Sequence, residues 1–164
     1  MRILGIDPGL TATGFGCVED RGRDFALVYA GSAAPPAALP LPERLTFLRT
    51  QTLDLIRSLA PAAVAVEQLF SHARHPRTAI QMAQARGVIL EACAAAAVPV
   101  AELAARRVKR AVAGAGDASK GQVGRMVARH LQLDAAPESE HEADALALAL
   151  CAHFEAAGAR KAKP

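Results

Sequence analysis

Three short apolar runs open the chain, and each predicts a β-strand: residues 2–7, 13–18 and 25–30. The first run ends at Asp7–Gly9, an Asp-Pro-Gly sequence typical of a tight turn. The polar segment between the second and third runs contains Gly22, which predicts a hairpin. Because these connections are short, we expect the strands to pair antiparallel on one side of a sheet.

Helical and strand patterns alternate along the rest of the chain. Leucines spaced by three and four residues predict an amphipathic helix over 42–59, and Pro42 suits its first turn. The remaining patterns predict strands at 62–67 and 98–103 and helices at 77–97, 104–113, 119–132 and 140–157. Pro99 confines the last strand to an edge or to its own start. Ser119 with Gln122 resembles a capping box.

This element order predicts an α/β protein with a mixed five-stranded sheet, three antiparallel strands followed by two parallel ones, flanked by helices. We expect a single domain over residues 1–157 and a basic mobile tail over 158–164. The length of 164 residues suits one domain and excludes most multi-domain enzymes. Alanine supplies 39 of these residues, so the hydrophobic content of 52% overstates the bulky apolar content.

The composition also bears on location. The longest uncharged stretch, 25–42, contains four prolines that would break a membrane-spanning helix, and the apolar start is too short for a signal peptide. The three cysteines are far apart and are interpreted as small core residues in a reducing compartment. We therefore expect a cytoplasmic protein with no membrane partner.

Charge is distributed unevenly along the chain. Residues 71–130 carry ten Lys or Arg against three acidic residues, whereas residues 131–150 carry five acidic residues and no Lys or Arg. A basic middle beside an acidic cluster suits a protein that holds a polyanion near a cation-binding site. A solvated surface with acidic residues capping one helix explains the same pattern.

Four side chains could form one polar site. Asp7 and Glu67 each end a predicted strand, and His141 lies three residues before Asp144 on one helix face. Taken alone, Asp7 is also a common turn residue, and His141 is also explained as a helix-start residue near solvent. If the two strands are neighbours, the carboxylates would repel one another unless a divalent cation neutralised them. Such an oxygen-rich site suits Mg²⁺ or Mn²⁺, and paired ions promote phosphodiester hydrolysis.

Six motifs in series resemble the RuvC family of Holliday-junction resolvases, with order and spacing kept over residues 2–153. These are Gly5–Gly9 with Thr13–Gly16, Val66–Phe70, Gln84–Val88, Ala105–Lys109, Ser119–Val123 and His141–Ala147. The resemblance implies an RNase H-like fold, a homodimer, and symmetric nicking of four-way DNA junctions during recombination and repair. It further implies two Mg²⁺ or Mn²⁺ ions per site, 5′-phosphate and 3′-hydroxyl ends, and branch-migration motor proteins as partners.

Carried over by position, the resemblance places Asp7, Glu67 and Asp144 in the catalytic and metal-binding site, with His141 as the fourth ligand. The family usually has Asp at this fourth position. A neutral imidazole nitrogen can also bind a divalent metal, but it removes one negative charge and is the softer ligand. We therefore expect a preference for Mn²⁺ and a stronger dependence of activity on pH.

The same resemblance indicates which residues contact DNA. Phe70 follows Glu67 in a polar loop and is suited to stacking on an unpaired base. Lys109 and Lys120 match basic positions near the DNA and the reacting phosphate. Further candidate backbone contacts are Arg74, Arg77, Arg106 and Arg110. Any single one of these cations is also explained as a solvated helix charge.

Other interpretations remain open from the residues alone. An RNase H-like nuclease acting on RNA or other branched DNA would share the acidic site, and a non-catalytic junction-binding protein would share the basic surface. An actin-like ATPase also has an Asp-Pro-Gly opening, but it needs two such domains and 164 residues are too few. The helix face that carries Ile80, Ala83 and Gly87 is a candidate dimer interface.

Overall fold

Five strands form one mixed sheet in the computed structural model, which describes residues 1–69 and 76–161. The strands are β1 (Arg2–Asp7), β2 (Thr13–Asp20), β3 (Phe25–Ala33), β4 (Ala63–Glu67) and β5 (Val100–Leu103). Their order across the sheet is β3-β2-β1-β4-β5. β2 pairs antiparallel with β1 and β3, whereas β4 lies parallel to β1 and β5 parallel to β4. The predicted sheet is confirmed, including the edge position of the strand that follows Pro99.

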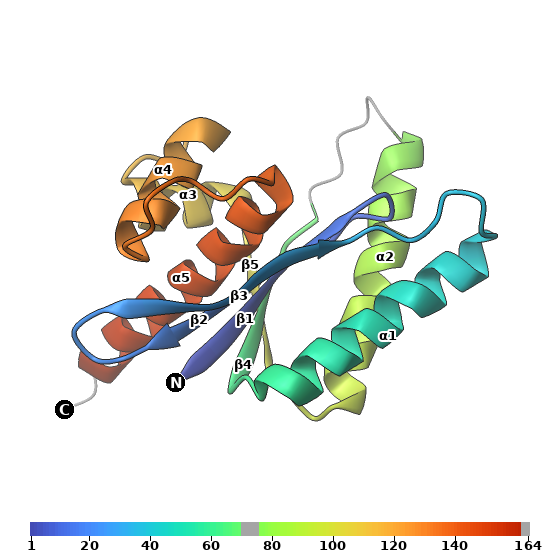
Figure 1. Ribbon diagram of the computed structural model, residues 1–164, viewed down its shortest axis with the longest axis horizontal. Coiled ribbons are helices and arrows are strands. Elements are labelled where there is room, and N and C mark those ends of the chain that lie inside the picture. The colour runs from blue at the N-terminus through green and yellow to red at the C-terminus, as the bar shows by residue number, and fades with distance from the viewer. Residues whose placement is uncertain (70–75, 162–164) are drawn as a thin grey trace.

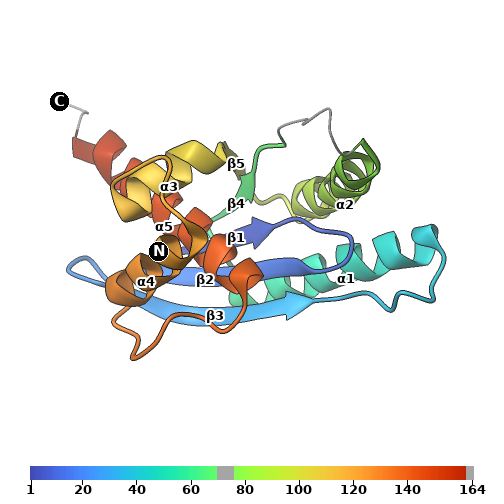
Figure 2. The same ribbon diagram turned by 90° about the horizontal axis from the view of Figure 1, so that it is seen from above.

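Helices cover both faces of this sheet (Figure 1). They are α1 (Leu41–Leu59), α2 (Pro76–Ala95), α3 (Ala105–Ala113), α4 (Lys120–His130) and α5 (Glu140–Lys161). α1 and α2 pack together on one face, and α3 and α4 are grouped beside α5 on the other (Figure 2). The predicted helices are confirmed within a few residues at each end. α5 differs most, because it continues through Lys161 and so includes residues 158–161 of the expected tail.

Strand alternation decides which face each side chain covers. Leu4 and Ile6 of β1 pack in the cluster that includes α1 and α2, whereas Ile3 packs in the cluster that includes α5. Successive side chains of a strand point to opposite faces, so Asp7 shares the face of Ile3. The same alternation in β4 places Glu67 on that face too. Both carboxylates therefore end their strands on the side covered by α5.

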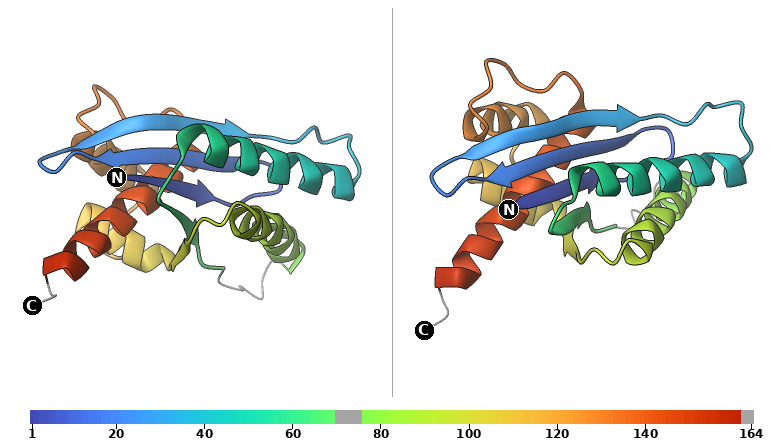
Figure 3. Two further views of the ribbon diagram at one scale, coloured as in Figure 1. Left: turned by 90° about the horizontal axis from the view of Figure 1, so that it is seen from below. Right: turned by 60° about the horizontal axis from the view of Figure 1, so that its bottom comes forward.

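Glycines let α5 lie directly against the strands. A Cβ atom at Gly5 would stand 1.9 Å from the carbonyl oxygen of Ala145, and one at Gly14 would stand 2.0 Å from the carbonyl oxygen of His141. No side chain could fit into either gap. Figure 3 shows α5 running obliquely across the strands. The start of α5 is thereby held close to the end of β1 and the start of β2.

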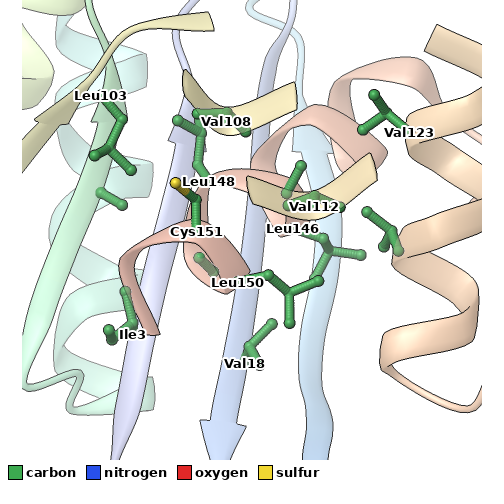
Figure 4. Packing of buried hydrophobic residues seen from close by; sticks show 14 of the residues in the cluster. Ile3, Val18, Leu103, Val108, Val112, Val123, Leu146, Leu148, Leu150 and Cys151 are labelled. Atoms are coloured by element: carbon green, nitrogen blue, oxygen red, sulfur yellow. The ribbon is translucent and has the colours of Figure 1, made fainter. Parts of the chain in front are cut away.

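The middle of α5 is enclosed on all sides. Every residue from Ala145 to Cys151 is buried. Figure 4 shows Leu146, Leu148 and Leu150 packed between the strands and helices α3 and α4. The alternation of Leu and Ala in this segment resembles a strand, but the predicted helix is confirmed. Alanine suits this position because a small side chain lets a central helix pack closely on every face.

The three cysteines are buried and unpaired, as predicted. Burial raises the pKa of each thiol, to about 11 for Cys17 and Cys93 and about 12 for Cys151. They are therefore unreactive core residues near neutral pH. Among the described helices, none combines the length and the apolar character needed to cross a membrane.

Candidate active site

The four predicted site residues line one cleft. Its volume is about 440 Å³, and Asp7, Glu67, His141 and Asp144 all border it. β1 and β4 contribute their last residues, Asp7 and Glu67, because the carboxyl ends of neighbouring parallel strands meet at one edge of the sheet. His141 and Asp144 come from the first turns of α5, one turn apart on the same face.

His141 and Asp7 are in direct contact. The ring Nδ1 of His141 donates a hydrogen bond to Oδ2 of Asp7 over 2.7 Å, and Asp7 is only 8% exposed. A carboxylate accepts, so the proton of a neutral ring lies on Nδ1. Nε2 then keeps its lone pair. This arrangement, in which a carboxylate orients a histidine, is the one that prepares an imidazole nitrogen for a metal ion.

Lys120 reaches the site from the first turn of α4. Its Nζ lies 3.2 Å from Oδ2 of Asp144 and 3.0 Å from Oε2 of Glu140. The predicted capping box starts this helix, because Ser119 accepts a hydrogen bond from the backbone N–H of Gln122 and the Gln122 side chain accepts one from the backbone of Ser119. The ammonium group is thereby held at the rim of the acidic cluster.

The acidic cluster is electrostatically unfavourable without a cation. Burial, and then the charges of Asp7 and Asp144, raise the pKa of Glu67 from 4.5 to about 7. Burial is also the main cause that raises the pKa of Asp7; the hydrogen bond from His141 opposes it, and the charge of Asp144 adds to it. Lys120 lowers the pKa of both carboxyl groups. Proton uptake near neutral pH is the response expected of carboxylates that lack a neutralising metal.

The donor set fits a hard divalent cation. Three carboxylates and one imidazole are the ligands that Mg²⁺ and Mn²⁺ accept in proteins. Their chemistry fits, but over residues 1–69 and 76–161 no three His, Cys, Asp or Glu side chains lie close enough together to hold a metal ion as they stand.

Thr13 and Arg44 hold the loop that follows Asp7. The hydroxyl of Thr13 donates to the carbonyl of Gly9 over 2.7 Å and accepts from the Gly9 N–H at 3.3 Å. Arg44 of α1 donates to the carbonyl of Leu10 over 3.0 Å. These bonds shape the wall of the cleft beside Asp7. Only the tertiary structure brings Arg44 to this loop.

The predicted DNA contacts fall into three groups. Lys109 and Lys120 line the cleft. Arg106 and Arg110 are exposed on α3 and lie outside the cleft lining. Phe70 and Arg74 lie outside the described residues, as does the side chain of Arg77, whose backbone belongs to the first turn of α2. Glu140, which pairs with Lys120, is a residue that sequence reasoning missed; its place in the first turn of a helix gives it a structural explanation.

Comparison with known proteins identifies the family. The family model for crossover junction endodeoxyribonuclease RuvC matches residues 3–153. A protein of that name from Xanthobacter autotrophicus is 44% identical over 161 residues, which cover 98% of this chain and 94% of the relative. The corresponding protein from Halorhodospira halophila is 48% identical over 157 residues, covering 95% and 92%.

The solved structures agree. The structure described as Thermus thermophilus RuvC in complex with Holliday junction substrate has a TM-score of 0.91 at 36% identity, covering 97% of this chain and 96% of that one. A structure of Thermus thermophilus RuvC alone has a TM-score of 0.88. The expected RNase H-like fold is confirmed by this match. The chain therefore belongs to the RuvC family of crossover junction endodeoxyribonucleases.

Proposed function

We propose that this protein resolves four-way DNA junctions by metal-dependent hydrolysis of one phosphodiester in each of two strands. The convergence of Asp7, Glu67, His141 and Asp144 in one cleft carries the proposal, because it builds an acidic cluster whose mutual repulsion a divalent cation would relieve. The likeness to a RuvC structure solved with a Holliday junction substrate supports the choice of DNA substrate.

In this mechanism Asp7, Glu67 and Asp144 would hold the cations, with the imidazole of His141 as the fourth ligand. Mg²⁺ or Mn²⁺, two ions in each site, supplies activation of water and neutralisation of charge at the phosphate. Asp7 fixes the orientation of the His141 ring through the bond at Nδ1. Lys120, beside Asp144, donates to a phosphate oxygen and balances its negative charge. The expected products carry a 5′-phosphate and a 3′-hydroxyl.

A basic surface beside the cleft binds the DNA backbone in this proposal. Lys109 lies within the cleft, and Arg106 and Arg110 extend the positive charge along α3. Arg74 and Arg77 add further contacts to the DNA backbone, and Phe70 stacks on a base that is unpaired near the cut. Phosphate contacts of this kind supply affinity without reading sequence, which suits a junction-selective nuclease.

Symmetric nicking requires two active sites related by a dimer axis. The exposed face of α2 supports the homodimer proposal. Ile80 is 58% exposed, and Ala83 and Gly87 of the same helix are also exposed. A large apolar side chain in such a position is typical of a contact surface. Branch-migration motor proteins as partners, and the cytoplasm as location, complete the proposal; the buried unpaired cysteines support a reducing compartment.

A synthetic four-way junction with immobile arms tests the function directly. Each strand is end-labelled in turn and incubated with the unmodified protein or with Asp7→Asn, in Mg²⁺ and separately in Mn²⁺. Paired symmetric nicks made by the unmodified protein alone would establish a resolvase and place Asp7 in its site. Tight binding without nicking in either ion would instead indicate a junction-binding protein. Cleavage of RNA or of linear duplex in preference to the junction would indicate a different RNase H-like nuclease.

A further inference from the structure

Arg86 of α2 joins the two strand ends beneath the acidic cleft. Its Nε donates a hydrogen bond to the backbone carbonyl of Glu67 over 3.1 Å, and its Nη2 forms an ion pair with Glu102 of β5. The Arg86 side chain is only 16% exposed. Arg86 belongs to the Gln84–Val88 motif.

The Asp-Pro-Gly turn explains why the Glu67 carbonyl needs this donor. The N–H of Gln68 donates to the carbonyl of Leu103 on β5, so the Glu67 carbonyl of the same trans peptide points the opposite way, toward β1. In the register that pairs Ile6 with Val66, the β1 donor opposite this carbonyl would be residue 8. Residue 8 is Pro8, which has no N–H to donate.

Arg86 takes the place of that missing donor. Pro8, Glu67 and Arg86 border the same cavity of about 300 Å³ beside the catalytic cleft, which agrees with this geometry. A carbonyl at such a position requires a partner. The guanidinium supplies one, and its second nitrogen is held in turn by the carboxylate of Glu102. Arg86 thereby joins α2 to β4 and β5 at Glu67, the residue whose side chain enters the acidic cluster.

We propose that Arg86 is a positioning residue, which fixes the backbone of Glu67 so that its carboxylate is aimed at the metal-binding cleft. The planar guanidinium can bond the Glu67 carbonyl and the Glu102 carboxylate together, whereas a lysine ammonium on a flexible stem does not hold this two-point geometry. This inference rests on the proposed metal-binding role of Glu67. In this proposal Arg86 acts through Glu67, so its effect is on metal binding and not on DNA affinity.

The test is a Mn²⁺ titration of the DNA-free protein, followed by electron paramagnetic resonance of the free ion. Arg86→Met should weaken Mn²⁺ binding about 10- to 100-fold, the loss typical of groups that orient metal ligands. Arg86→Lys should weaken it nearly as much, and Glu102→Gln less, in the same direction. Junction affinity in Ca²⁺ should stay within about two-fold of the unmodified protein for all three.

Arg49→Met is the matched control. Arg49 forms an ion pair with Glu91 that joins α1 to α2 and includes no residue of β4 or β5. Its loss should leave Mn²⁺ binding unchanged. A general loosening of α2 would affect Arg49→Met and Arg86→Met alike, and this result would overturn the proposal. Normal Mn²⁺ binding by Arg86→Lys would overturn the claim that the guanidinium must bond the Glu67 carbonyl and the Glu102 carboxylate together. If Arg86→Met lacks a cooperative thermal transition and is therefore not folded, the Mn²⁺ titrations of Arg86→Lys and Glu102→Gln test the proposal in its place.

Glu67→Gln in the same titration separates this inference from the proposed function. Unchanged Mn²⁺ binding by Glu67→Gln would overturn the role of Glu67 as a ligand, and the positioning role of Arg86 with it. Weakened binding by Glu67→Gln together with normal binding by Arg86→Met would overturn the positioning role alone. Amide hydrogen exchange of Gln68 gives a second readout, and it should become faster in Arg86→Met but not in Arg49→Met.

Discussion

Replacing Glu67 by Gln should abolish cleavage and yet stabilise the metal-free protein at high pH. Burial and two neighbouring carboxylates raise the pKa of Glu67 from 4.5 to about 7. Each pKa unit corresponds to about 1.4 kcal/mol, so ionised Glu67 destabilises the folded state by up to about 3 kcal/mol. Solvent reaches this half-buried group, which reduces the value to about 2 kcal/mol.

Proton linkage determines whether Glu67 stabilises or destabilises the folded protein as the pH changes. Because the folded protein has the higher pKa, the contribution of Glu67 to stability is fully present below pH 4.5 and is lost as the pH rises through about 7. Glu67→Gln has no proton to lose at this position. Its melting temperature in EDTA should therefore exceed that of the unmodified protein by roughly 4 to 8 °C at pH 8, and by little at pH 4.5.

Thermal unfolding followed by circular dichroism measures this difference. Saturating Mg²⁺ at pH 8 should cancel the advantage of Glu67→Gln, because the ion neutralises the same charge. The reasoning is refuted if Glu67→Gln melts at a lower temperature than the unmodified protein at pH 8. It is refuted equally by a shift of the same size at both pH values, which would indicate a packing effect.

Three further substitutions test other parts of the site. Gly14→Ala should lower stability by roughly 1 to 3 kcal/mol and cleavage with it, because the new Cβ would stand 2.0 Å from the His141 carbonyl oxygen; an unchanged melting temperature would contradict the close approach of α5. His141→Asp should lower the ratio of the Mn²⁺ rate to the Mg²⁺ rate, because it restores an oxygen ligand; equal ratios would contradict metal ligation by the imidazole. Phe70→Ala should reduce cleavage about 10-fold or more while junction affinity is kept; parallel losses would contradict a stacking role.

Local patterns were sufficient for most of the secondary structure. Gly22 does lie in the β2–β3 hairpin with a φ of 91°, in the region that favours glycine. The capping box at Ser119 starts α4, and Pro99 precedes the edge strand β5. These signals act over a few residues, so the sequence displays them directly. The end of α5 was missed, because Gly158 is a typical stop signal and the helix nevertheless continues past it to Lys161.

The convergence of the acidic residues also followed from the sequence. Asp7 and Glu67 end parallel strands, and alternation along each strand determines the face on which they lie. His141 and Asp144 share a helix face because they are three residues apart. These rules pair the side chains two by two, the family resemblance places all four in one site, and the structure brings all four to one cleft.

The contacts that shape this cleft depend on residues far apart in the chain. Arg44 bonds to the loop after Asp7, and Arg86 bonds to the end of β4 across a separation of 19 residues. Neither contact follows from spacing or periodicity, since each depends on how helices pack on the sheet. The sequence by itself therefore determined the elements, the sheet and the acidic residues through short-range periodicity and a family resemblance. Only tertiary packing decided how the backbone around those residues is held, because its hydrogen-bond partners come from other elements.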